Sequence, residues 1–175
     1  MVTWSEMSIA RPDLVSAGRE LFYQVGVGLA FLSTVRRDGG PRLNPMCPIV
    51  ADDRIFALIV PGPKCADLQR DGRYAMHSFP CDTNEDAFMM SGHAEAVTDA
   101  GVRTRVVAQF LAERSGLTMT EADMFDSVLF EFAIDRVLLT RTSGHGDPTP
   151  THTIWHAPSS AGGPGGPGGQ SKHLL

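Results

Sequence analysis

The amino-acid sequence predicts a mainly β fold, an antiparallel β-barrel flanked by α-helices. Segments of strand length, some alternating and some wholly apolar, follow one another from residue 27 onward. Tight-turn signals, Asp38-Gly39-Gly40 and Asp52-Asp53, separate several of these segments. Two longer stretches have apolar residues at helical spacing. Short antiparallel strands with a few helices alongside are typical of such a barrel.

Length and composition indicate one globular domain. The chain has 175 residues, 42% hydrophobic and 20% charged, which supports a single domain over residues 1–156. The stretch 157–175 is rich in Gly and Pro and is predicted to be a flexible tail, because it has little apolar area to bury. The net charge of −5 argues against nucleic acid or an anionic membrane as the main partner.

Several features suit a cytoplasmic protein. No apolar run approaches the roughly 20 residues that span a bilayer, and the N-terminus lacks the apolar segment of a secretory signal. The chain has an odd number of cysteines, Cys47, Cys65 and Cys81, and none of them forms a CxxC motif. This pattern suits free thiols in a reducing cytosol.

Two longer helices are predicted, besides a short one within residues 61–72. The first covers about residues 12–23, because Pro12 and Asp13 suit a helix start and apolar residues then recur at helical spacing. The second covers residues 99–114, where the apolar residues again form one face.

Six strands are expected, and residues 151–156 are a candidate for a short last one. The six span residues 27–35, 41–50, 54–60, 73–79, 87–98 and 127–142. Three prolines in the second strand remove ladder donors and place it at an edge or make it bulged. Gly92 predicts a bulge in the fifth. The run IFALIV (55–60) suits a strand buried on both faces, which together with the second helix suggests a core extended by a second subunit.

The segment PGPKCADLQRDG (61–72) carries the main functional signal. Pro63 suits the first position of a short helix, whose free N–H groups attract anions, and Lys64 adds a full positive charge there. Gly62 lets a phosphate approach the backbone closely. Arg42 and Asn44 could add donors from a neighbouring strand. The alternative is that Lys64 is a solvated helix start.

The order of these elements resembles the FMN-binding split-barrel family, which includes pyridoxamine 5′-phosphate oxidase and flavin- and deazaflavin-dependent oxidoreductases. The family pattern has a threonine-rich strand end, a D-G-x-P turn, a strand with a proline, and a K-A-x-x-L-x-x-D-x-R helix. The matching residues here are Thr34, Asp38, Gly39, Pro41, Pro45, Lys64, Ala66, Leu68, Asp71 and Arg73. The resemblance covers roughly residues 25–140 and implies a six-stranded antiparallel split β-barrel that works as a homodimer.

The resemblance also implies a cofactor groove where two subunits meet. Lys64 would bind the cofactor phosphate, with Arg42 assisting. Trp155 would pack against the ring from the other subunit, and the alternative for Trp155 is a simple packing residue of the interface. The remaining implied groove residues are Asn44, Pro45, Met46 and Cys47 along the ring edge, and Ile59 and Val60 in the wall.

Departures from the family pattern bear on the ligand. Pyridoxamine phosphate oxidases have a Ser-Arg pair before the lysine, where this chain has Gly62-Pro63, so two side-chain donors to the phosphate are missing. The substrate motif with an arginine near the C-terminus has no counterpart in residues 151–158. Pyridoxamine phosphate is therefore a poor candidate substrate. The options are weaker FMN binding, the deazaflavin coenzyme, or no flavin.

Other constellations give weaker signals. His145, Asp147, His152 and His156 form a conceivable metal or haem site, and some split-barrel relatives bind haem through histidine; the alternative is a polar loop with solvated imidazoles. No metal ligands and no catalytic residue are assigned.

The sequence as a whole thus predicts an FMN-binding oxidoreductase that acts on a small organic substrate. The alternatives are a deazaflavin-dependent reductase, a haem-binding split-barrel protein, and a cofactor-free dimeric binding module. Neither the substrate nor the electron donor follows from the sequence.

Overall fold

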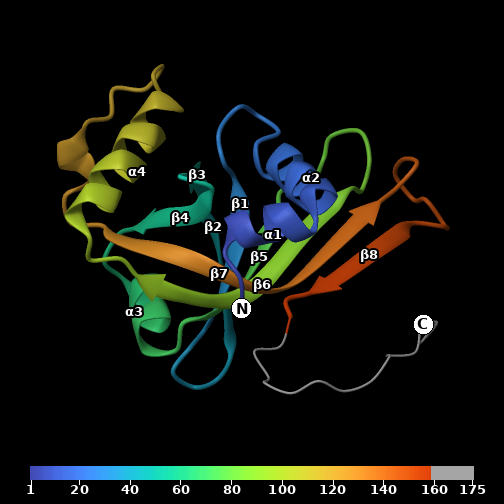
Figure 1. Cartoon of the computed structure of the whole chain (residues 1–175), viewed down its shortest axis with the longest axis horizontal. Helices are drawn as coiled ribbons and strands as arrows, with labels where there is room; N and C mark the ends of the chain where they lie inside the picture. Colours follow the sequence, from blue (N-terminus) through green and yellow to red (C-terminus); the bar gives the residue numbers. More distant parts are fainter. Residues whose placement is uncertain (159–175) are drawn as a thin grey trace.

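The computed structural model describes residues 1–158, which form an antiparallel sheet curled into a half-barrel with helices packed on it (Figure 1). The α-helices are α1 (Trp4–Ala10), α2 (Pro12–Phe22), α3 (Pro63–Arg70) and α4 (Ala100–Ala112), and a short 3₁₀ helix, η1, spans Glu121–Met124. The strands are β1 (Ala30–Val35), β2 (Pro41–Met46), β3 (Ile49–Ala51), β4 (Arg54–Ile59), β5 (Arg73–Ser78), β6 (Ala87–Ala96), β7 (Val128–Arg141) and β8 (Thr151–His156). The tail predicted over 157–175 lies, beyond residue 158, outside the described residues.

The strands pair in the order β2-β1-β5-β6-β7-β4-β3, and β8 pairs with β7. All the pairs of strands are antiparallel. One side of the long strand β7 pairs with β6, while its other side pairs first with β4 and then with β8. In the part of the chain that the structure describes, no helix is long and apolar enough to cross a membrane.

The turns predicted from the sequence are confirmed. Asp38-Gly39-Gly40 joins β1 to β2 in a hairpin. Asp52 and Asp53 both have positive φ, 49° and 53°, in the tight turn between β3 and β4. The register of β6 against β7 shifts between Ser91 and Gly92, which is the predicted bulge. A side chain at Gly92 would begin 2.1 Å from the Ala133 carbonyl oxygen, so the bulge needs a glycine.

The described sheet has eight strands where six and a candidate seventh were predicted. The difference arises at Cys47 and Pro48, where the predicted strand 41–50 splits: β2 pairs with β1, whereas β3 pairs with β4. The candidate strand 151–156 is present as β8. As its prolines predicted, β2 lies at one end of the sheet. The sequence analysis missed α1, which begins with a capping box between Thr3 and Glu6.

The main core lies between the inner face of the sheet and the helices α1 and α2. Trp4 of α1 and Phe22 of α2 both meet Phe88 of β6 edge-to-face, with ring centroids 6.2 and 5.4 Å apart. All three rings are at most 2% exposed. Gly18 lets α2 approach closely, because a Cβ there would lie 2.7 Å from the Phe88 ring.

A second, smaller core lies on the other side of β4. Phe56 of β4 and Ile49 of β3 pack beneath Val106 and Phe110 of α4. The strand β4 is therefore buried on both faces, as its sequence predicted. The second layer is α4 of the same chain, however, so this burial does not require a second subunit.

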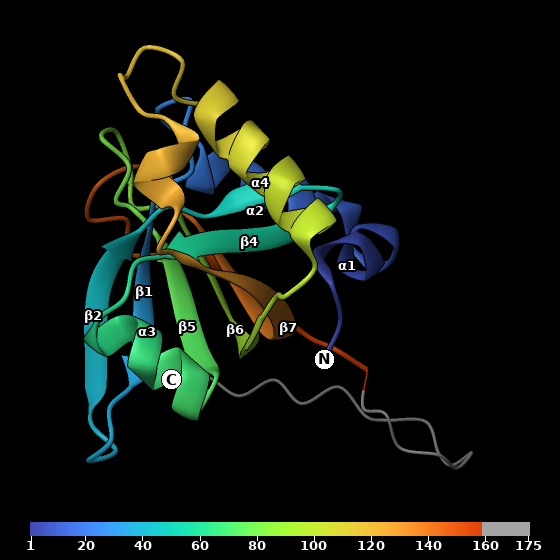
Figure 2. The ribbon, with the colours of Figure 1, turned by 90° about the vertical axis from the view of Figure 1, so that its left-hand side faces the viewer.

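The helix α3 lies beside the β1–β2 hairpin (Figure 2). A buried carboxylate of α3 fixes it there. Asp67 is 4% exposed and accepts hydrogen bonds from Thr34 Oγ1 at 3.1 Å, Arg42 Nε at 2.6 Å and Arg70 Nη1 at 3.2 Å. Burial alone would raise the pKa of Asp67, but the hydrogen bonds from the two arginines and the threonine outweigh it and hold the pKa below its usual value. One carboxylate thus links β1, β2 and α3.

The second core predicts a large difference between two Phe→Ala substitutions. Phe56→Ala should lower the free energy of unfolding by about 3–5 kcal/mol, because its ring is fully buried. Phe125→Ala should change it by less than about 0.5 kcal/mol, because that ring is 83% exposed. Urea denaturation of both variants measures this, and equal losses would contradict the described packing.

The Asp67 carboxylate predicts a pH-dependent stability. Because its pKa is lower in the folded chain, its contribution is fully present above the unfolded value of about 3.9 and is lost as pH falls through the folded pKa. Asp67→Asn should lower the free energy of unfolding by about 1–3 kcal/mol at pH 7 and flatten its decline at acid pH. Denaturation from pH 7 to pH 3, with Asp126→Asn as the exposed control, measures both effects. A profile of Asp67→Asn that coincides with the wild type would refute the role of this carboxylate.

Candidate functional site

Lys64 lies against the edge strand of the sheet. It is the second residue of α3, and its Nζ donates a hydrogen bond to the Pro45 carbonyl oxygen of β2 at 3.2 Å. Partial burial lowers the pKa of Lys64, although the nearby Cys47 opposes this shift. The structure therefore brings together Lys64, Pro45 and Cys47, three of the residues predicted to form the cofactor site.

The start of α3 is open to an anion. Gly62 is the N-cap residue, and no side chain caps the first turn. Its φ of 156° and ψ of −174° belong to a backbone region that is essentially restricted to glycine. Pro63 occupies the first helical position, as predicted. The first N–H groups of the helix thus have no side-chain acceptor, and the ammonium group of Lys64 lies beside them.

Arg42, which was predicted to assist Lys64, binds a different group of the fold. Its Nε is bound to Asp67, farther along α3. Arg42 lines an open hollow of about 500 Å³ at the turn end of the β1–β2 hairpin, together with Arg36, Arg37, Asp38 and Asp67. One donor of Arg42 is thus already used inside the fold, and its role at a phosphate remains a prediction.

Two of the predicted groove residues point into the protein. Met46 is 5% exposed and Ile59 1% exposed, and both pack in the main core, so only their backbone can reach a ligand. Val60, by contrast, is 63% exposed. Asn44 of β2 is half-buried and lies opposite Leu32 of β1.

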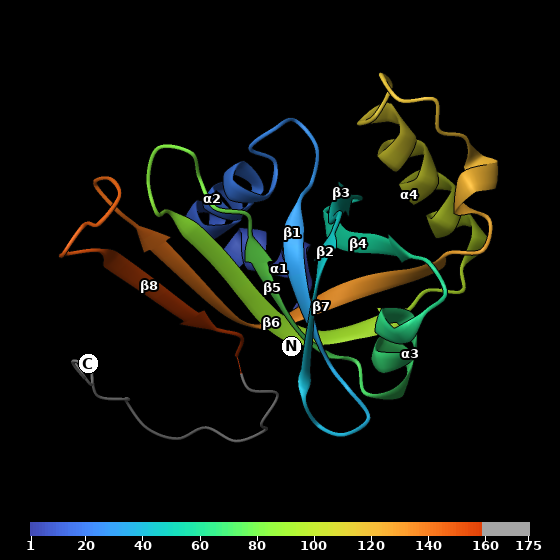
Figure 3. The same ribbon diagram turned by 180° about the vertical axis from the view of Figure 1, so that it is seen from behind.

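Trp155 lies on a different part of the sheet. It is half-buried on β8, opposite Val137 of β7, and packs against the main core. In Figures 1 and 3, β8 and α3 lie on opposite sides of the molecule. Within one chain Trp155 is therefore remote from Lys64, and its predicted contact with a ring needs a second copy of the chain.

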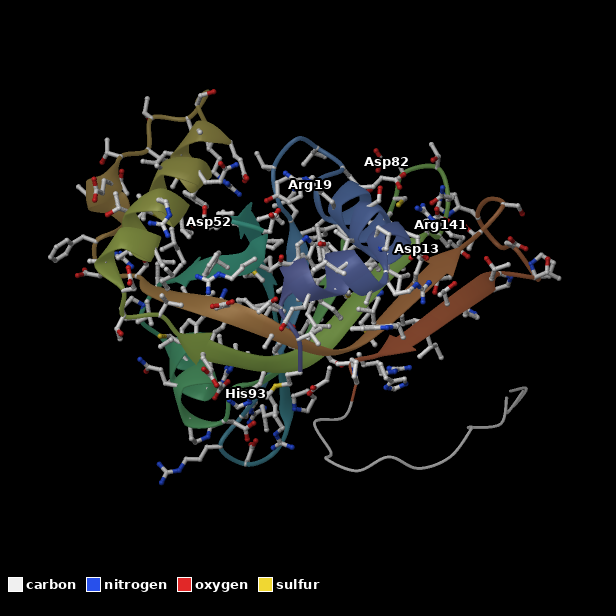
Figure 4. All side chains as sticks on the ribbon, viewed as in Figure 1. Asp13, Arg19, Asp52, Asp82, His93 and Arg141 are labelled. Atoms are coloured by element: carbon white, nitrogen blue, oxygen red, sulfur yellow. The ribbon has the colours of Figure 1, made fainter. Side chains whose placement is uncertain are left out.

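The histidines of the predicted polar cluster do not come together. His152 Nδ1 lies 3.0 Å from Thr140 Oγ1, and His145 Nε2 lies 3.2 Å from the Asp82 carbonyl oxygen. In Figure 4, Asp82, which His145 contacts, lies at the upper right of the molecule, and His93 lies far from it, near α3. Within residues 1–158 no group of three or more His, Cys, Asp or Glu side chains could hold a metal ion.

The outer face of the sheet carries a row of six residues, five apolar and one an exposed histidine, which we call the apolar row. Strand pairing places Pro45, Phe31, His77, Met89, Leu138 and Ile154 side by side across β2, β1, β5, β6, β7 and β8. Figure 3 shows this face toward the viewer, with α1 and α2 behind the sheet. Ile154 is 53% exposed, and Leu43, on the same face of β2, is 64% exposed.

The sequence analysis missed Asp67, the residue that holds α3 in place. One sequence feature could have indicated it. Asp67 follows Lys64 by three positions, so the two side chains lie on neighbouring turns of one helical face. An acidic residue there, close to a strand that carries Arg42, is the only signal that could have identified it.

Sequence and fold comparisons agree with this architecture. The sequence model of the family described as pyridoxamine 5′-phosphate oxidase matches residues 23–141. No curated protein matches the chain by sequence.

Solved structures share the fold at low sequence identity. A conserved hypothetical protein from Mycobacterium tuberculosis is 22% identical, with a TM-score of 0.53 over 62% of this chain and 74% of that one. A protein of the pyridoxine phosphate oxidase family from Clostridium acetobutylicum, related to general stress protein 26, is 12% identical, with a TM-score of 0.56 over 87% and 95% of the two chains. The haem storage protein HutZ from Vibrio cholerae is 15% identical, with a TM-score of 0.54 over 74% and 93%.

The half-barrel, the order of its strands and the family match over residues 23–141 lead to one conclusion. The chain belongs to the pyridoxamine 5′-phosphate oxidase family and has its split-barrel fold.

Proposed function

We propose that the protein binds FMN and uses it for two-electron redox chemistry on a small organic substrate. The observation that carries this proposal is the contact between Lys64 Nζ and the Pro45 carbonyl, which places a cation beside an uncapped helix start and an edge strand. A phosphate bound there would meet both the ammonium group and the free N–H groups of α3.

The edge strand supplies the second part of the site. Because β2 is at the end of the sheet, the backbone groups on its outer side have no strand partner. The segment from Asn44 to Cys47 can therefore offer donors and acceptors to the polar edge of a flat ring. Bound flavin would supply the hydride chemistry, while the chain supplies phosphate binding and ring orientation.

The residues fit a flavin phosphate only in part. Gly62 and Pro63 stand where family members with pyridoxamine phosphate oxidase activity have two side-chain donors, so Lys64 and the helix start are the main anion contacts. The deazaflavin coenzyme is the second candidate, because the same cation and helix start would hold its phosphate. Haem is the third candidate, since the Vibrio cholerae neighbour stores haem, but no histidine lies among the residues assembled around Lys64. A cofactor-free binding module is the fourth.

The outer face of the sheet supports a homodimer. The apolar row from Pro45 to Ile154 crosses six strands, and its exposed members belong to a surface that a second copy could cover. The candidate site lies at one end of this row, because Pro45 belongs to both. A dimer formed on this face would place the cofactor sites beside the contact between subunits. Trp155 faces the opposite side of β8 from Ile154 and packs against the main core, so its predicted contact with a ring does not follow from this dimer.

Cofactor binding tests the anchor. Purified wild type should be yellow and release flavin on heating, whereas a Soret band would identify haem and a colourless protein would direct the titration to the deazaflavin. Lys64→Ala should weaken binding of the identified cofactor by about 10- to 100-fold, because a charge-assisted contact contributes about 1.5–3 kcal/mol.

Arg73→Ala is the matched control for Lys64→Ala. Arg73 follows the far end of α3, is 68% exposed and pairs with Asp71, so its loss should leave cofactor affinity unchanged. If Lys64→Ala binds as tightly as the wild type in isothermal titration, Lys64 is not the anchor.

Two Leu→Asp substitutions test the dimer. Leu43→Asp introduces a charge on the outer face and should shift the protein from dimer to monomer, because burying an unpaired carboxylate costs several kcal/mol. Leu117→Asp, at a residue exposed to 60% beyond α4, should leave the dimer intact. Sedimentation equilibrium measures both, and a wild type that sediments at the monomer mass of 18.9 kDa would rule out the dimer.

A further inference from the structure

The corner between β2 and β3, at Cys47 and Pro48, is held by residues from distant parts of the chain. It is the point at which the edge strand of the candidate site ends. Tyr23, which follows α2, reaches it from one side, and the C-terminal end of α4 lies behind Tyr23. None of these contacts was predicted from the sequence, and none is needed to explain the phosphate anchor.

Tyr23 makes the direct contact with the corner. Its Oη accepts a hydrogen bond from the Val50 N–H at 2.9 Å and donates one to Glu113 Oε1 at 3.1 Å; the Pro48 carbonyl oxygen lies 3.4 Å away. Val50 is 5% exposed and belongs to β3, the last strand of the sheet. The phenol therefore satisfies a buried N–H group at the end of the sheet.

Glu113 is itself fixed by its neighbours. Its Oε1 accepts from Gln109 Nε2 at 3.0 Å, and its Oε2 lies 3.4 Å from Arg114 Nη1. The side chains of Glu113 and Arg114 are only 10% and 6% exposed. Arg114 also donates to the Gly28 carbonyl oxygen at 3.4 Å and stacks over the Phe110 ring at 3.9 Å.

The backbone closes on the corner from the opposite direction. A Cβ added at Gly28 would lie 1.9 Å from the Pro48 carbonyl oxygen, so the chain before β1 packs directly on the corner. On the far side of β3, Arg105 of α4 binds Asp52 at 2.8 Å, and Asp52 lies beside α4 in Figure 4. Helix α4 thus supports both ends of the short strand that follows the corner.

We propose that Tyr23 is a positioning residue, whose hydroxyl group clamps the Cys47–Pro48 corner and so fixes the edge backbone of residues 44–47 for a bound ring. The clamp is one hydrogen-bonded chain from Val50 through Tyr23 to Glu113, the C-cap residue of α4. Its effect on a ring rests on the proposed cofactor site, whereas its effect on the corner does not.

The hydroxyl group stays a donor at physiological pH. Burial raises the pKa of Tyr23 to about 12, with a further contribution from the Glu113 carboxylate, while the bond from Val50 acts in the opposite direction. Deprotonation is therefore no part of the role, and replacing Tyr23 by Phe removes the clamp but keeps the ring.

The three free thiols allow a test that needs no cofactor. Cys47 is at the corner, Cys65 is a buried residue of α3, and Cys81 is in the loop after β5. In Tyr23→Phe, iodoacetamide should alkylate Cys47 several-fold faster than in the wild type, measured by mass spectrometry of each cysteine peptide. The rates at Cys65 and Cys81 should not change.

Matched variants separate the clamp from general stability. Tyr74→Phe also removes a buried hydroxyl group, which donates to the Ala133 carbonyl at 3.1 Å, and should leave Cys47 unchanged. Glu113→Gln keeps a neutral acceptor for the Tyr23 hydroxyl group. Its rate of alkylation at Cys47 should lie between those of the wild type and Tyr23→Phe. The clamp is rejected if Cys47 reacts at the wild-type rate in Tyr23→Phe, or if all three thiols react faster together.

Cofactor affinity then tests the consequence for the ring. If wild type binds flavin, Tyr23→Phe should weaken binding at least several-fold and Tyr74→Phe should not. Faster labelling of Cys47 with unchanged flavin affinity would overturn the positioning role. A wild type that binds no flavin would overturn the proposed function instead, while the labelling rates would still decide whether the clamp exists.

Discussion

The Asp67 carboxylate is the contact on which the candidate site depends. It is almost fully buried and joins a threonine of β1, an arginine of β2 and an arginine of its own helix. A buried charge is tolerated only when it is paired and hydrogen-bonded, so the three donors and the carboxylate fix one another. That arrangement sets the position of α3 along β2, and the position of α3 brings Lys64 to the Pro45 carbonyl.

The two cores leave the site at an edge of the sheet. Helices α1 and α2 cover the inner face, and α4 covers β3 and β4 from the other side. The strand β2 receives no such cover on its outer side, and its prolines keep it from extending the ladder. An edge whose backbone groups have no strand partner can bind a flat polar ring, and the apolar face next to it suits a second copy of the chain. The chain belongs to the pyridoxamine 5′-phosphate oxidase family, and the groups at this edge decide which ligand it can bind.

The helix α4 gives the molecule a second link to the same edge. The sequence pattern of β4 suggested that another subunit covers it, but α4 performs this role and also carries Glu113 and Arg114 to the corner after β2. The phosphate end and the ring end of the candidate site are thus supported separately, one by Asp67 and the other by Tyr23. Changes in one need not disturb the other, because the two networks share no residue.

The sequence by itself determined the local elements: the turns at Asp38-Gly39 and Asp52-Asp53, the helix start at Pro63 and the bulge at Gly92. Each depends on backbone preferences of a few neighbouring residues, which a sequence displays directly. Periodicity and order then identified the barrel. Only the tertiary structure decided that the strand predicted over 41–50 breaks at Pro48, that Ile59 and Met46 face the core, and that Trp155 is remote from Lys64. These outcomes depend on contacts between residues far apart in the chain, such as Thr34 with Asp67 and Tyr23 with Glu113, and no local pattern encodes such pairings.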